Sequence, residues 1–416
     1  MFFIYRLLTN LIFIFSPIII LIRLLKKKEH PTRFKEKFGI YTKKKLEGKL
    51  IWFHGASVGE ILSIIPLIEK LEKKNNIKQI LVTSNTLSSS TILSNLKLKK
   101  TIHQFFPIDT VYHTNKFLRY WKPSMAIFID SEIWPNMINN IKKQSATLIL
   151  INARITNKSF KRWKIFNLSA KHIFQKFDIC FSSNLKSKNF LKSLGAKKIR
   201  YIGNLKFSQI ENNKNILNKS VNKFFLTKKI WCASSTHYKE EKICGVVHKK
   251  LKKKYKNLLT IIIPRHIHRV KEIINEIKEL GLKVHIHNSK KKIDSETDIY
   301  LVNSFGQTKS FFKVCKTVFL GGSIIKHGGQ NPLEAARYGC EVLHGPHVWN
   351  FDEIYTLLKK YRMSNKILSS NQLAYKVDKS LNNKNNSKNL KLKIKVLGNK
   401  ILNSTLNEIN FYIKKD

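Results

Sequence analysis

Short apolar runs alternate with longer amphipathic stretches from residue 48 onward. In the stretch Ile61–Lys73 the apolar residues recur every three or four positions, which predicts a helix with one buried face. The apolar runs predict strands, in two sets of six that are separated by a basic, asparagine-rich segment, Glu211–Lys229. The first set is Leu50–His54, Ile80–Thr83, Ala126–Asp130, Thr147–Ile151, Asp178–Ser182 and Arg200–Gly203. The second set is Ile230–Ala233, Leu258–Ile263, Lys283–His287, Asp298–Val302, Thr317–Leu320 and Glu341–Leu343.

This alternation is typical of βαβ units, which build parallel sheets with helices on both faces. The two sets predict an α/β fold of two Rossmann-like, doubly wound domains that face each other across a central cleft. Ligands of such sheets bind at the carboxyl ends of the strands. We expect an N-terminal membrane anchor (residues 1–28), a first domain (29–208), a second domain (209–380) and a basic C-terminal tail or helix (381–416).

The N-terminus is a long apolar segment that ends in a basic cluster. Residues 2–25 read FFIYRLLTNLIFIFSPIIILIRLL, and Lys26, Lys27 and Lys28 follow directly. The uncharged part, Leu7–Ile22, has 16 residues, just fewer than the roughly 17–25 that cross a bilayer. The segment predicts attachment to a membrane, either across it or within its interface. The basic cluster predicts a cytoplasmic position for the rest of the protein.

Composition adds a strong positive charge. The 416 residues include 78 Lys and Arg against 26 Asp and Glu, a formal net charge of +52. Hydrophobic residues at 43% and aromatic residues at 11% exclude a disordered polycation. The charge favours an anionic partner, either a membrane leaflet or a nucleic acid, although a lysine-rich coding bias accounts for it equally well. Because the lysines are spread along the whole chain and no RNA-reading motif occurs, we expect no nucleic-acid partner.

The strongest local motif follows the first predicted strand. Residues 54–60 read HGASVGE, a turn of small residues and then the start of a helix. Gly55, Ala56 and Gly59 allow a ligand to approach the backbone, and the helix N-terminus offers N–H donors. Glu60 has two interpretations, a partner of the helix dipole or a general base for an incoming hydroxyl group.

A second acidic motif, residues 130–136 (DSEIWPN), follows the strand Ala126–Asp130. Acidic groups at the end of a buried strand favour a role in a cleft, because a buried charge needs a partner. The alternative is an ordinary helix start, with Ser131 as the N-cap and Pro135 in the first turn.

Motifs in the second half of the chain predict sites for an anion. One predicted strand ends in Pro264 and Arg265, and the guanidinium group suits a bidentate contact with phosphate. Gly321-Gly322-Ser323 closes another strand, and residues 328–334 (GGQNPLE) open a helix of the kind that binds anions at its N-terminus. Glu334, in the first turn of that helix, is placed to accept both hydroxyl groups of a ribose.

Several other chemistries are disfavoured. No D-x-D pair occurs among the aspartates, and no GxxxxGK[ST] motif supports a P-loop. His266 and His268 lie two residues apart without a pair of carboxylates nearby, which makes a poor metal site. The five cysteines form no CxxC pair, which argues against a disulfide scaffold or a zinc ribbon. We therefore expect neither a metal nor a cofactor.

Taken in order, the motifs resemble those of the 3-deoxy-D-manno-octulosonic acid (Kdo) transferases of lipopolysaccharide assembly. The resemblance runs from the N-terminal segment to about Tyr355. It includes HGASVGE (54–60), SEIWPN (131–136), NARIT (152–156), SF (159–160), GNLKF (203–207), ASSTH (233–237), PRH (264–266), GGS (321–323), GGQNPLEAA (328–336) and GPHVWNF (345–351).

The resemblance implies a GT-B architecture and an inverting, metal-independent transfer of Kdo from CMP-Kdo to a hydroxyl group of a lipid A precursor, lipid IVA. The implied location is the cytoplasmic side of the inner membrane, against its anionic surface. By motif position, Glu60 corresponds to the general base, and Glu132 and Lys206 to residues that support the transition state. The implied CMP site consists of Pro264, Arg265, Phe305, Gly306, Gln307, Asn331, Pro332, Leu333 and Glu334.

Four positions depart from the family pattern. Gln330 stands where histidine is usual and Ala335 where proline is common, while Asn303 and Gln307 replace acidic residues. These departures concern contacts with the nucleotide and leave the implied base in place. An alternative is another membrane-associated GT-B glycosyltransferase, with a UDP-sugar donor and a lipid acceptor.

Overall fold

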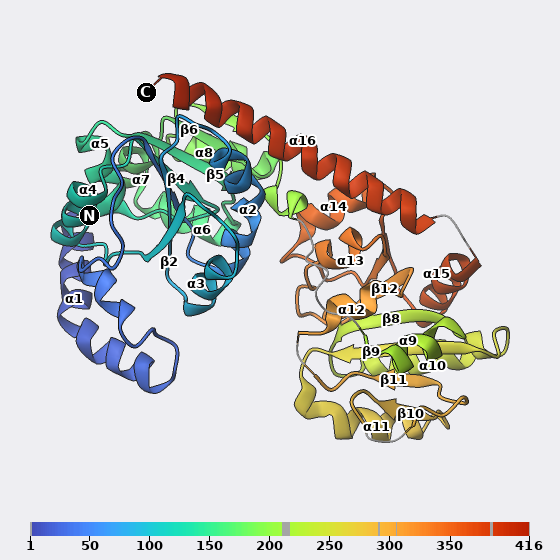
Figure 1. Cartoon of the computed structure of the whole chain (residues 1–416). Coiled ribbons are helices and arrows are strands. Elements are labelled where there is room, and N and C mark those ends of the chain that lie inside the picture. Colours follow the sequence, from blue (N-terminus) through green and yellow to red (C-terminus); the bar gives the residue numbers. More distant parts are fainter. Residues whose placement is uncertain (1, 210–216, 290–291, 305, 383–385, 416) are drawn as a thin grey trace. The chain divides into compact units, whose positions relative to one another are not determined.

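The computed structural model describes residues 2–209, 217–289, 292–304, 306–382 and 386–415. The chain forms two compact units, which are drawn in Figure 1 with colours that follow the sequence. Unit 1 consists of Met1–Ile210 together with Gly398–Asp416, and unit 2 consists of Glu211–Leu397. Each unit is an α/β body built on one seven-stranded sheet.

The sheet of unit 1 has the strand order β3-β2-β1-β4-β5-β6-β7, and all of its strands are parallel. Its strands are β1 (Leu50–His54), β2 (Gln79–Ser84), β3 (Thr101–Phe105), β4 (Met125–Ile129), β5 (Thr147–Ala153), β6 (Ile179–Ser182) and β7 (Ile199–Tyr201). The chain builds β1, β2 and β3 outward in one direction and then returns to place β4 on the other side of β1. That return creates a topological switch point between β1 and β4, where such sheets bind ligands.

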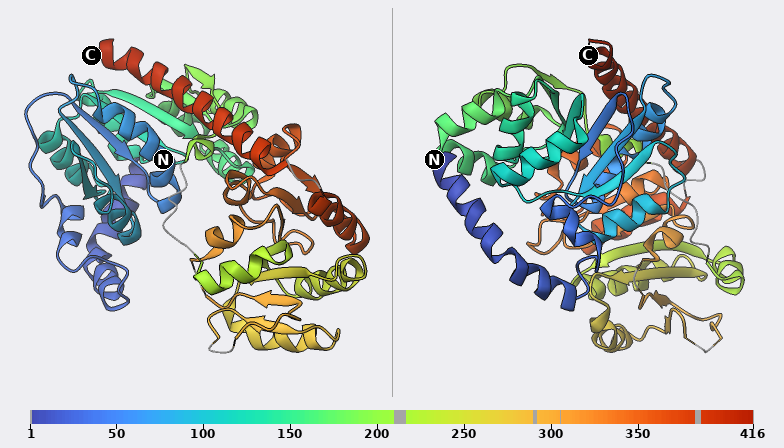
Figure 2. Two further views of the ribbon diagram at one scale, coloured as in Figure 1. Left: turned by 45° about the vertical axis from the view of Figure 1, so that its right-hand side comes forward. Right: turned by 60° about the vertical axis from the view of Figure 1, so that its left-hand side comes forward.

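Helices cover both faces of this sheet, as the views of Figure 2 show. One face packs Trp52, Phe128 and Leu150 against apolar side chains of α4, α5, α7 and α8. On the other face, α2 begins directly after β1 and buries its own apolar stripe. The helices of unit 1 before residue 210 are α1 (Phe2–Leu25), η1 (Arg33–Phe38), α2 (Val58–Glu72), α3 (Leu87–Ser94), α4 (Val111–Trp121), α5 (Pro135–Lys143), α6 (Asn157–Ile165), α7 (Asn167–Phe174), α8 (Leu185–Ser193) and η2 (Leu205–Ser208).

The sheet of unit 2 is also parallel throughout, in the order β10-β11-β9-β8-β12-β13-β14. Its switch point lies between β8 and β12. The strands are β8 (Lys229–Thr236), β9 (Leu258–Pro264), β10 (Val284–Ile286), β11 (Ile299–Leu301), β12 (Thr317–Leu320), β13 (Glu341–His344) and β14 (Ser364–Lys366). The helices are α9 (Lys219–Leu226), α10 (Glu240–Lys252), η3 (Ile267–Arg269), α11 (Val270–Lys278), α12 (Thr308–Phe312), α13 (Leu333–Arg337), α14 (Asp352–Lys360) and α15 (Ser370–Asn382), followed by α16 (Asn386–Lys415).

The predicted fold class is confirmed: both sheets are parallel and doubly wound, and the predicted helix at residues 61–73 is α2. All twelve predicted strands are present with small shifts at their ends. The prediction omitted β3 and β14, which read TIHQF and SNK and carry polar residues in place of an apolar run. Both are edge strands, and polar side chains of β3 make tertiary contacts, since His103 contacts Ser84 and the amide nitrogen of Gln104 contacts Thr42.

The N-terminal helix α1 lies on the outside of unit 1, and it is long and apolar enough to cross a membrane. One side of it contacts the unit: the Tyr5 hydroxyl donates to Asp109 Oδ2 at 2.6 Å, and the rings of Phe13 and His113 have centroids 4.7 Å apart. Its buried residues are Thr9, Ser16 and Ile20. Most of its other apolar side chains are exposed.

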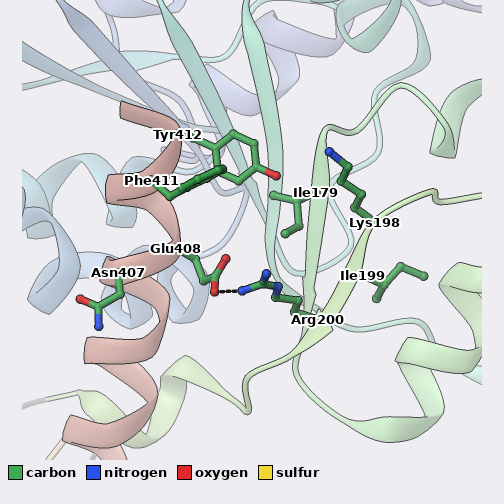
Figure 3. A pocket seen from close by; sticks show the side chains of 8 residues that line it. All are labelled: Ile179, Lys198, Ile199, Arg200, Asn407, Glu408, Phe411 and Tyr412. Atoms are coloured by element: carbon green, nitrogen blue, oxygen red, sulfur yellow. Dashed lines mark hydrogen bonds and ion pairs between the residues drawn. The ribbon is translucent and has the colours of Figure 1, made fainter. Parts of the chain in front are cut away.

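The C-terminal helix α16 contributes to both units, because its residues from Gly398 onward belong to unit 1. There it packs near the edge strand β7, where Arg200 forms an ion pair with Glu408. Figure 3 shows the pocket of about 530 Å³ that lies between this helix and the sheet edge. It is lined by Ile179, Lys198, Ile199, Arg200, Asn407, Glu408, Phe411 and Tyr412. None of the site residues expected from the sequence lines it.

The role of α16 in unit 1 predicts a stability difference between two of its residues. Ile409 is fully buried, whereas Phe411 is 62% exposed. Ile409→Ala is expected to lower the free energy of unfolding of unit 1 by about 2–4 kcal/mol, through lost burial and the cavity left behind. Phe411→Ala, the matched control, is expected to change it by less than about 1 kcal/mol. Thermal and urea unfolding of the full chain measure both, and equal effects would contradict this packing.

Candidate active site

The expected catalytic residues of unit 1 come from the two loops that flank its switch point. Glu60 follows β1, and Glu132 follows β4, the neighbouring strand on the other side of the switch. Parallel strands all end at the same edge of the sheet, so both carboxylates lie at the ligand-binding edge. The structure therefore brings these two carboxylates to the same edge of the sheet, after neighbouring strands.

Glu60 closes the turn between β1 and α2. The Ser57 hydroxyl accepts the backbone N–H of Glu60 and donates to its Oε1 at 2.6 Å, while Oε2 accepts the backbone N–H of Ala56 at 2.8 Å. This is a capping box, which stabilises the helix start. A side chain at position 55 would be tight here, because its Cβ atom would lie 3.1 Å from the Cβ of Glu60 and from Ile129 Cδ1.

The surroundings of Glu60 also change its pKa. Burial raises the pKa of Glu60, the nearby carboxylates of Glu132 and Asp130 raise it further, and the hydrogen bonds from Ser57 and Ala56 oppose the shift. A carboxylate with a raised pKa is a stronger base than an ordinary one. The structure shows Glu60 as a helix-capping residue, and its raised pKa is compatible with the second interpretation, a general base.

The loop after β4 brings a cation into the same cluster. Asp130 adopts a left-handed backbone conformation with φ of 61°, which is rare for a residue other than glycine. Its Oδ2 lies 3.1 Å from the Nζ of Lys206. Lys206 sits on η2, whose start is held by Asn152 and Asn204, since their side chains accept the backbone N–H groups of Leu205 and Lys206. Asp130 therefore positions the predicted lysine.

The alternative interpretation of this motif, in which Ser131 caps the following helix, is wrong. The helix α5 begins at Pro135, and its N-cap residue is Trp134, whose side chain makes no capping hydrogen bond. Asp109, from the segment after β3, accepts the backbone N–H groups of Asn136 and Met137 at 3.1 and 2.8 Å. A distant carboxylate provides the cap, which local sequence could not show. Glu132 is instead held by the indole N–H of Trp134, at 2.8 Å from its Oε2.

In unit 2, the loop Gly321-Gly322-Ser323 is organised around a buried glutamate. Glu240, the first residue of α10, is fully buried and accepts four backbone N–H groups, those of His237, Gly322, Ser323 and Ile324, at 2.7–3.1 Å. The N–H groups of this loop are thus committed to an internal anion. Gly321 is also required by close packing, since a Cβ atom there would lie 2.5 Å from the carbonyl oxygen of Ser235.

The cationic and polar residues expected at the CMP site lie in several loops of unit 2. Pro264 ends β9, and the exposed Arg265 follows it directly. The pKa of His237 is lowered to about 4, mainly by burial and in part by the nearby charge of Arg265. Gln330 contacts His237 at 3.5 Å. His237, which the sequence interpretation did not single out, therefore lies beside Arg265 and Gln330.

The remaining predicted CMP residues are placed as follows. Asn331 accepts the backbone N–H of Leu333, and Pro332 stands directly before α13, with Glu334 in its first turn. Gly306 has a φ of 79°, and Gln307 lies 2.6 Å from His287 Nε2. Phe305 lies outside the described residues. Among the described residues, no group of three His, Cys, Asp or Glu side chains is arranged to hold a metal ion.

Comparison with known proteins identifies similar chains. Residues 32–209 match the family described as 3-Deoxy-D-manno-octulosonic-acid transferase (kdotransferase). The chain is 34% identical over 391 residues to the 3-deoxy-D-manno-octulosonic acid transferase of Rickettsia bellii, with 93% of each chain covered. It is 32% identical over 371 residues to a probable mitochondrial 3-deoxy-D-manno-octulosonic acid transferase of Arabidopsis thaliana, covering 86% of this chain and 83% of the relative.

A solved structure extends the comparison to the fold. A UDP-N-acetylglucosamine 2-epimerase structure from Listeria monocytogenes, itself a putative assignment, aligns with a TM-score of 0.60 at 14% identity. It covers 89% of this chain and 98% of that one. At this identity the likeness concerns the fold alone, and it confirms the expected GT-B type of architecture.

The role of Glu240 predicts a measurable loss of stability. In Glu240→Gln an amide NH₂ group replaces one acceptor oxygen and faces backbone N–H donors. Unit 2 is expected to lose about 2–5 kcal/mol of unfolding free energy, since two buried donors lose their acceptor. Glu272→Gln is the matched control, because Glu272 is a half-exposed partner of Arg269 and its ion pair contributes about 1 kcal/mol or less. Differential scanning calorimetry distinguishes the two, and an unchanged transition in Glu240→Gln would refute the role.

Proposed function

The chain belongs to the 3-deoxy-D-manno-octulosonic acid transferase family, and from this we propose that it transfers Kdo from CMP-Kdo to a hydroxyl group of a lipid A precursor such as lipid IVA. Such a step belongs to the synthesis of the lipopolysaccharide inner core. The observation that carries the proposal is the cluster of Glu60, Glu132, Asp130 and Lys206 at the switch point of unit 1.

In this proposal Glu60 is the general base. Its carboxylate accepts the proton of the acceptor hydroxyl as that oxygen attacks the anomeric carbon of Kdo, and the bond from that carbon to the CMP phosphate breaks. Attack opposite the leaving group inverts the configuration. The two hydrogen bonds that Glu60 accepts occupy part of its capacity, because a carboxylate has about four lone-pair sites.

Lys206 and Glu132 are proposed to stabilise the charges that change during transfer. The ammonium group of Lys206, held by Asp130, is suited to the carboxylate of Kdo or to the departing phosphate. Glu132 is suited to the positive charge that develops on the sugar ring. Preorganised charges of this kind usually supply the largest part of the rate enhancement.

Unit 2 is proposed to bind CMP-Kdo. Arg265 provides an exposed cation at the end of a buried strand, which suits the phosphate, and Glu334 is placed for the ribose hydroxyls. Pro264, Gly306, Gln307, Asn331, Pro332 and Leu333 complete the proposed site, together with Phe305. The hydrogen bond between Gln307 and His287 orders the loop in which an acidic residue is common in the family.

The N-terminal helix is proposed to attach the protein to the cytoplasmic face of the inner membrane. Contacts from Phe2 at one end to Arg23 at the other hold α1 against unit 1 and its following loop. A helix packed on its own domain along its length is suited to lie in the interface and not to cross the bilayer. Its exposed apolar side and the adjoining Lys26–Lys28 would contact acyl chains and anionic headgroups.

The activity is tested with purified protein, CMP-Kdo and lipid IVA, and with UDP-sugars as competing donors. Glu60→Gln is expected to lower kcat about 10²–10⁴-fold, the usual contribution of a general base, and glutamine is chosen because it also forms capping boxes. Glu69→Gln, on an exposed position of the same helix, is the matched control. Mass spectrometry of the product measures transfer. Turnover only with a UDP-sugar, or full activity in Glu60→Gln, would contradict the proposal.

The raised pKa of Glu60 predicts the pH dependence. Because the ionised form is the base, kcat/KM is expected to rise with pH through a pKa above the ordinary glutamate value of about 4.3, and to be lost as pH falls below it. A pH-rate profile of the wild type at saturating acceptor measures this limb. If the residual activity of Glu60→Gln shows the same rise with pH, the ionisation that causes the rise belongs to another group.

Membrane attachment is tested by flotation with vesicles. Replacing the exposed Ile14 and Ile18 by aspartate is expected to lower binding to vesicles with anionic lipid by about tenfold or more, since each side chain loses apolar burial and gains charge. Tyr375→Asp, at an exposed site on α15, is the control. Equal binding of the two variants would place the attachment elsewhere.

A further inference from the structure

A fully buried histidine lies directly beside the proposed site of unit 1. His54, the last residue of β1, has no exposed surface. Its ring stacks on Phe106, with centroids 3.8 Å apart, and meets Phe128 and Trp134 edge-on. Aromatic rings therefore fix the plane of the imidazole, and its two nitrogen atoms can reach only the partners that lie in that plane.

The Nδ1 atom of His54 faces Thr83 on the neighbouring strand β2. Nδ1 lies 2.9 Å from the Thr83 hydroxyl, and the indole N–H of Trp52 donates to the same hydroxyl oxygen, also at 2.9 Å. Since the indole can only donate, it uses a lone pair of that oxygen. The hydroxyl hydrogen is then best directed to Nδ1, because its other acceptor, the Phe53 carbonyl oxygen, lies at 3.4 Å. The Trp52 and Phe53 contacts favour Nδ1 as an acceptor and the ring proton on Nε2, although the ring also contacts the backbone of Thr83.

The Nε2 atom faces the catalytic carboxylate proposed above. It lies 3.4 Å from Oε2 of Glu132, and among the described residues this buried nitrogen has no hydrogen bond of standard geometry. The same Oε2 accepts the indole N–H of Trp134 at 2.8 Å. Both protein contacts thus converge on one oxygen of Glu132, and the other oxygen, Oε1, is the one available to a substrate.

We propose that His54 is a positioning residue for the transferase reaction: as a neutral imidazole it presents its Nε2–H to Glu132 and fixes the rotation of that carboxylate. This inference rests on the proposed function. Glu132 is the one charged group that the described contacts bring to the His54 ring. Burial lowers the pKa of His54, against the opposing effect of Glu132, so the ring stays neutral at physiological pH.

The proposed role requires that the His54 ring be neutral when it faces Glu132. An imidazolium would cancel the negative charge that Glu132 is proposed to offer to the sugar ring, whereas a neutral donor orients the carboxylate and leaves its charge in place. Thr83 and Trp52 act behind His54 by fixing which nitrogen carries the proton. Such outer partners commonly set the orientation of a functional carboxylate or imidazole.

The first experiment reads the tautomer without any assay of activity. In protein labelled with ¹⁵N-histidine, the His54 signals are assigned as those lost in His54→Gln. We expect a Nε2–H tautomer that persists from pH 8 to pH 5.5, and a change in its Nε2 shift in Glu132→Gln. An Nδ1–H tautomer, or protonation of His54 near pH 6.5, would overturn the inference even if the protein proves to be an active Kdo transferase.

The second experiment separates positioning from stability. Asparagine cannot reach Glu132 from position 54, while the longer glutamine can place an amide N–H near the position of Nε2. We expect His54→Asn to lower kcat about 10- to 100-fold, the effect of removing one hydrogen bond to a charged group, with KM for both substrates nearly unchanged. His54→Gln should recover at least a third of the wild-type kcat.

Thr83→Val provides an independent variant that leaves His54 in place. It is expected to lower kcat several-fold and to mix the two tautomers in the NMR spectrum. All variants are compared below their measured thermal transitions, so that only folded protein is assayed. Equal kcat values in His54→Asn and wild type, or equal losses in His54→Asn and His54→Gln, would show a packing role only. If the wild type itself lacks transferase activity, the proposed function fails while the tautomer measurement still decides the geometry.

Discussion

The structure depends on a few carboxylates, most of them buried and one, Glu60, partly buried, that accept hydrogen bonds from loop backbone N–H groups. Asp109 holds the start of α5, Glu240 holds the Gly321-Gly322-Ser323 loop, and Glu60 holds the turn after β1. Glu36 plays a similar part, because it accepts the backbone N–H of Phe105 while it pairs with Arg33. Loops at the ends of parallel strands expose several N–H groups at once, and an unsatisfied buried N–H is costly, so an internal anion is an effective solution.

This use of acidic residues explains part of the charge distribution. The chain has 26 acidic residues against 78 basic ones, and a notable share of the acidic side chains lies inside. The lysines remain largely at the surface, where they are little compensated. The positive exterior is therefore stronger than the formal charge alone conveys, and it suits a protein proposed to work against anionic lipid.

The sequence was sufficient for the parallel, doubly wound sheets, because buried central strands are continuous apolar runs. It was insufficient for the edge strands β3 and β14, whose polar residues are satisfied by tertiary contacts. The carboxylates Glu60 and Glu132 could be placed at one sheet edge, since all strands of a parallel sheet end at the same edge. The sequence left open the alternative in which Ser131 caps α5, because the residue that does so in space, Asp109, lies more than twenty residues earlier. His54 stood within the recognised motif, yet only the side-chain geometry shows that it faces Glu132.

The helix α16 has a consequence for biosynthesis. Residues 398–415 complete a body whose other residues precede 210, so roughly 190 residues of unit 2 are translated in between. At about 5–20 residues per second this delay is on the order of 10–40 s. During that interval the surface that later receives Ile401, Ile409 and Ile413 is uncovered on the nascent chain. The N-terminal part of unit 1 thus leaves the ribosome first but completes its packing last. During this interval it offers an exposed apolar surface to a chaperone.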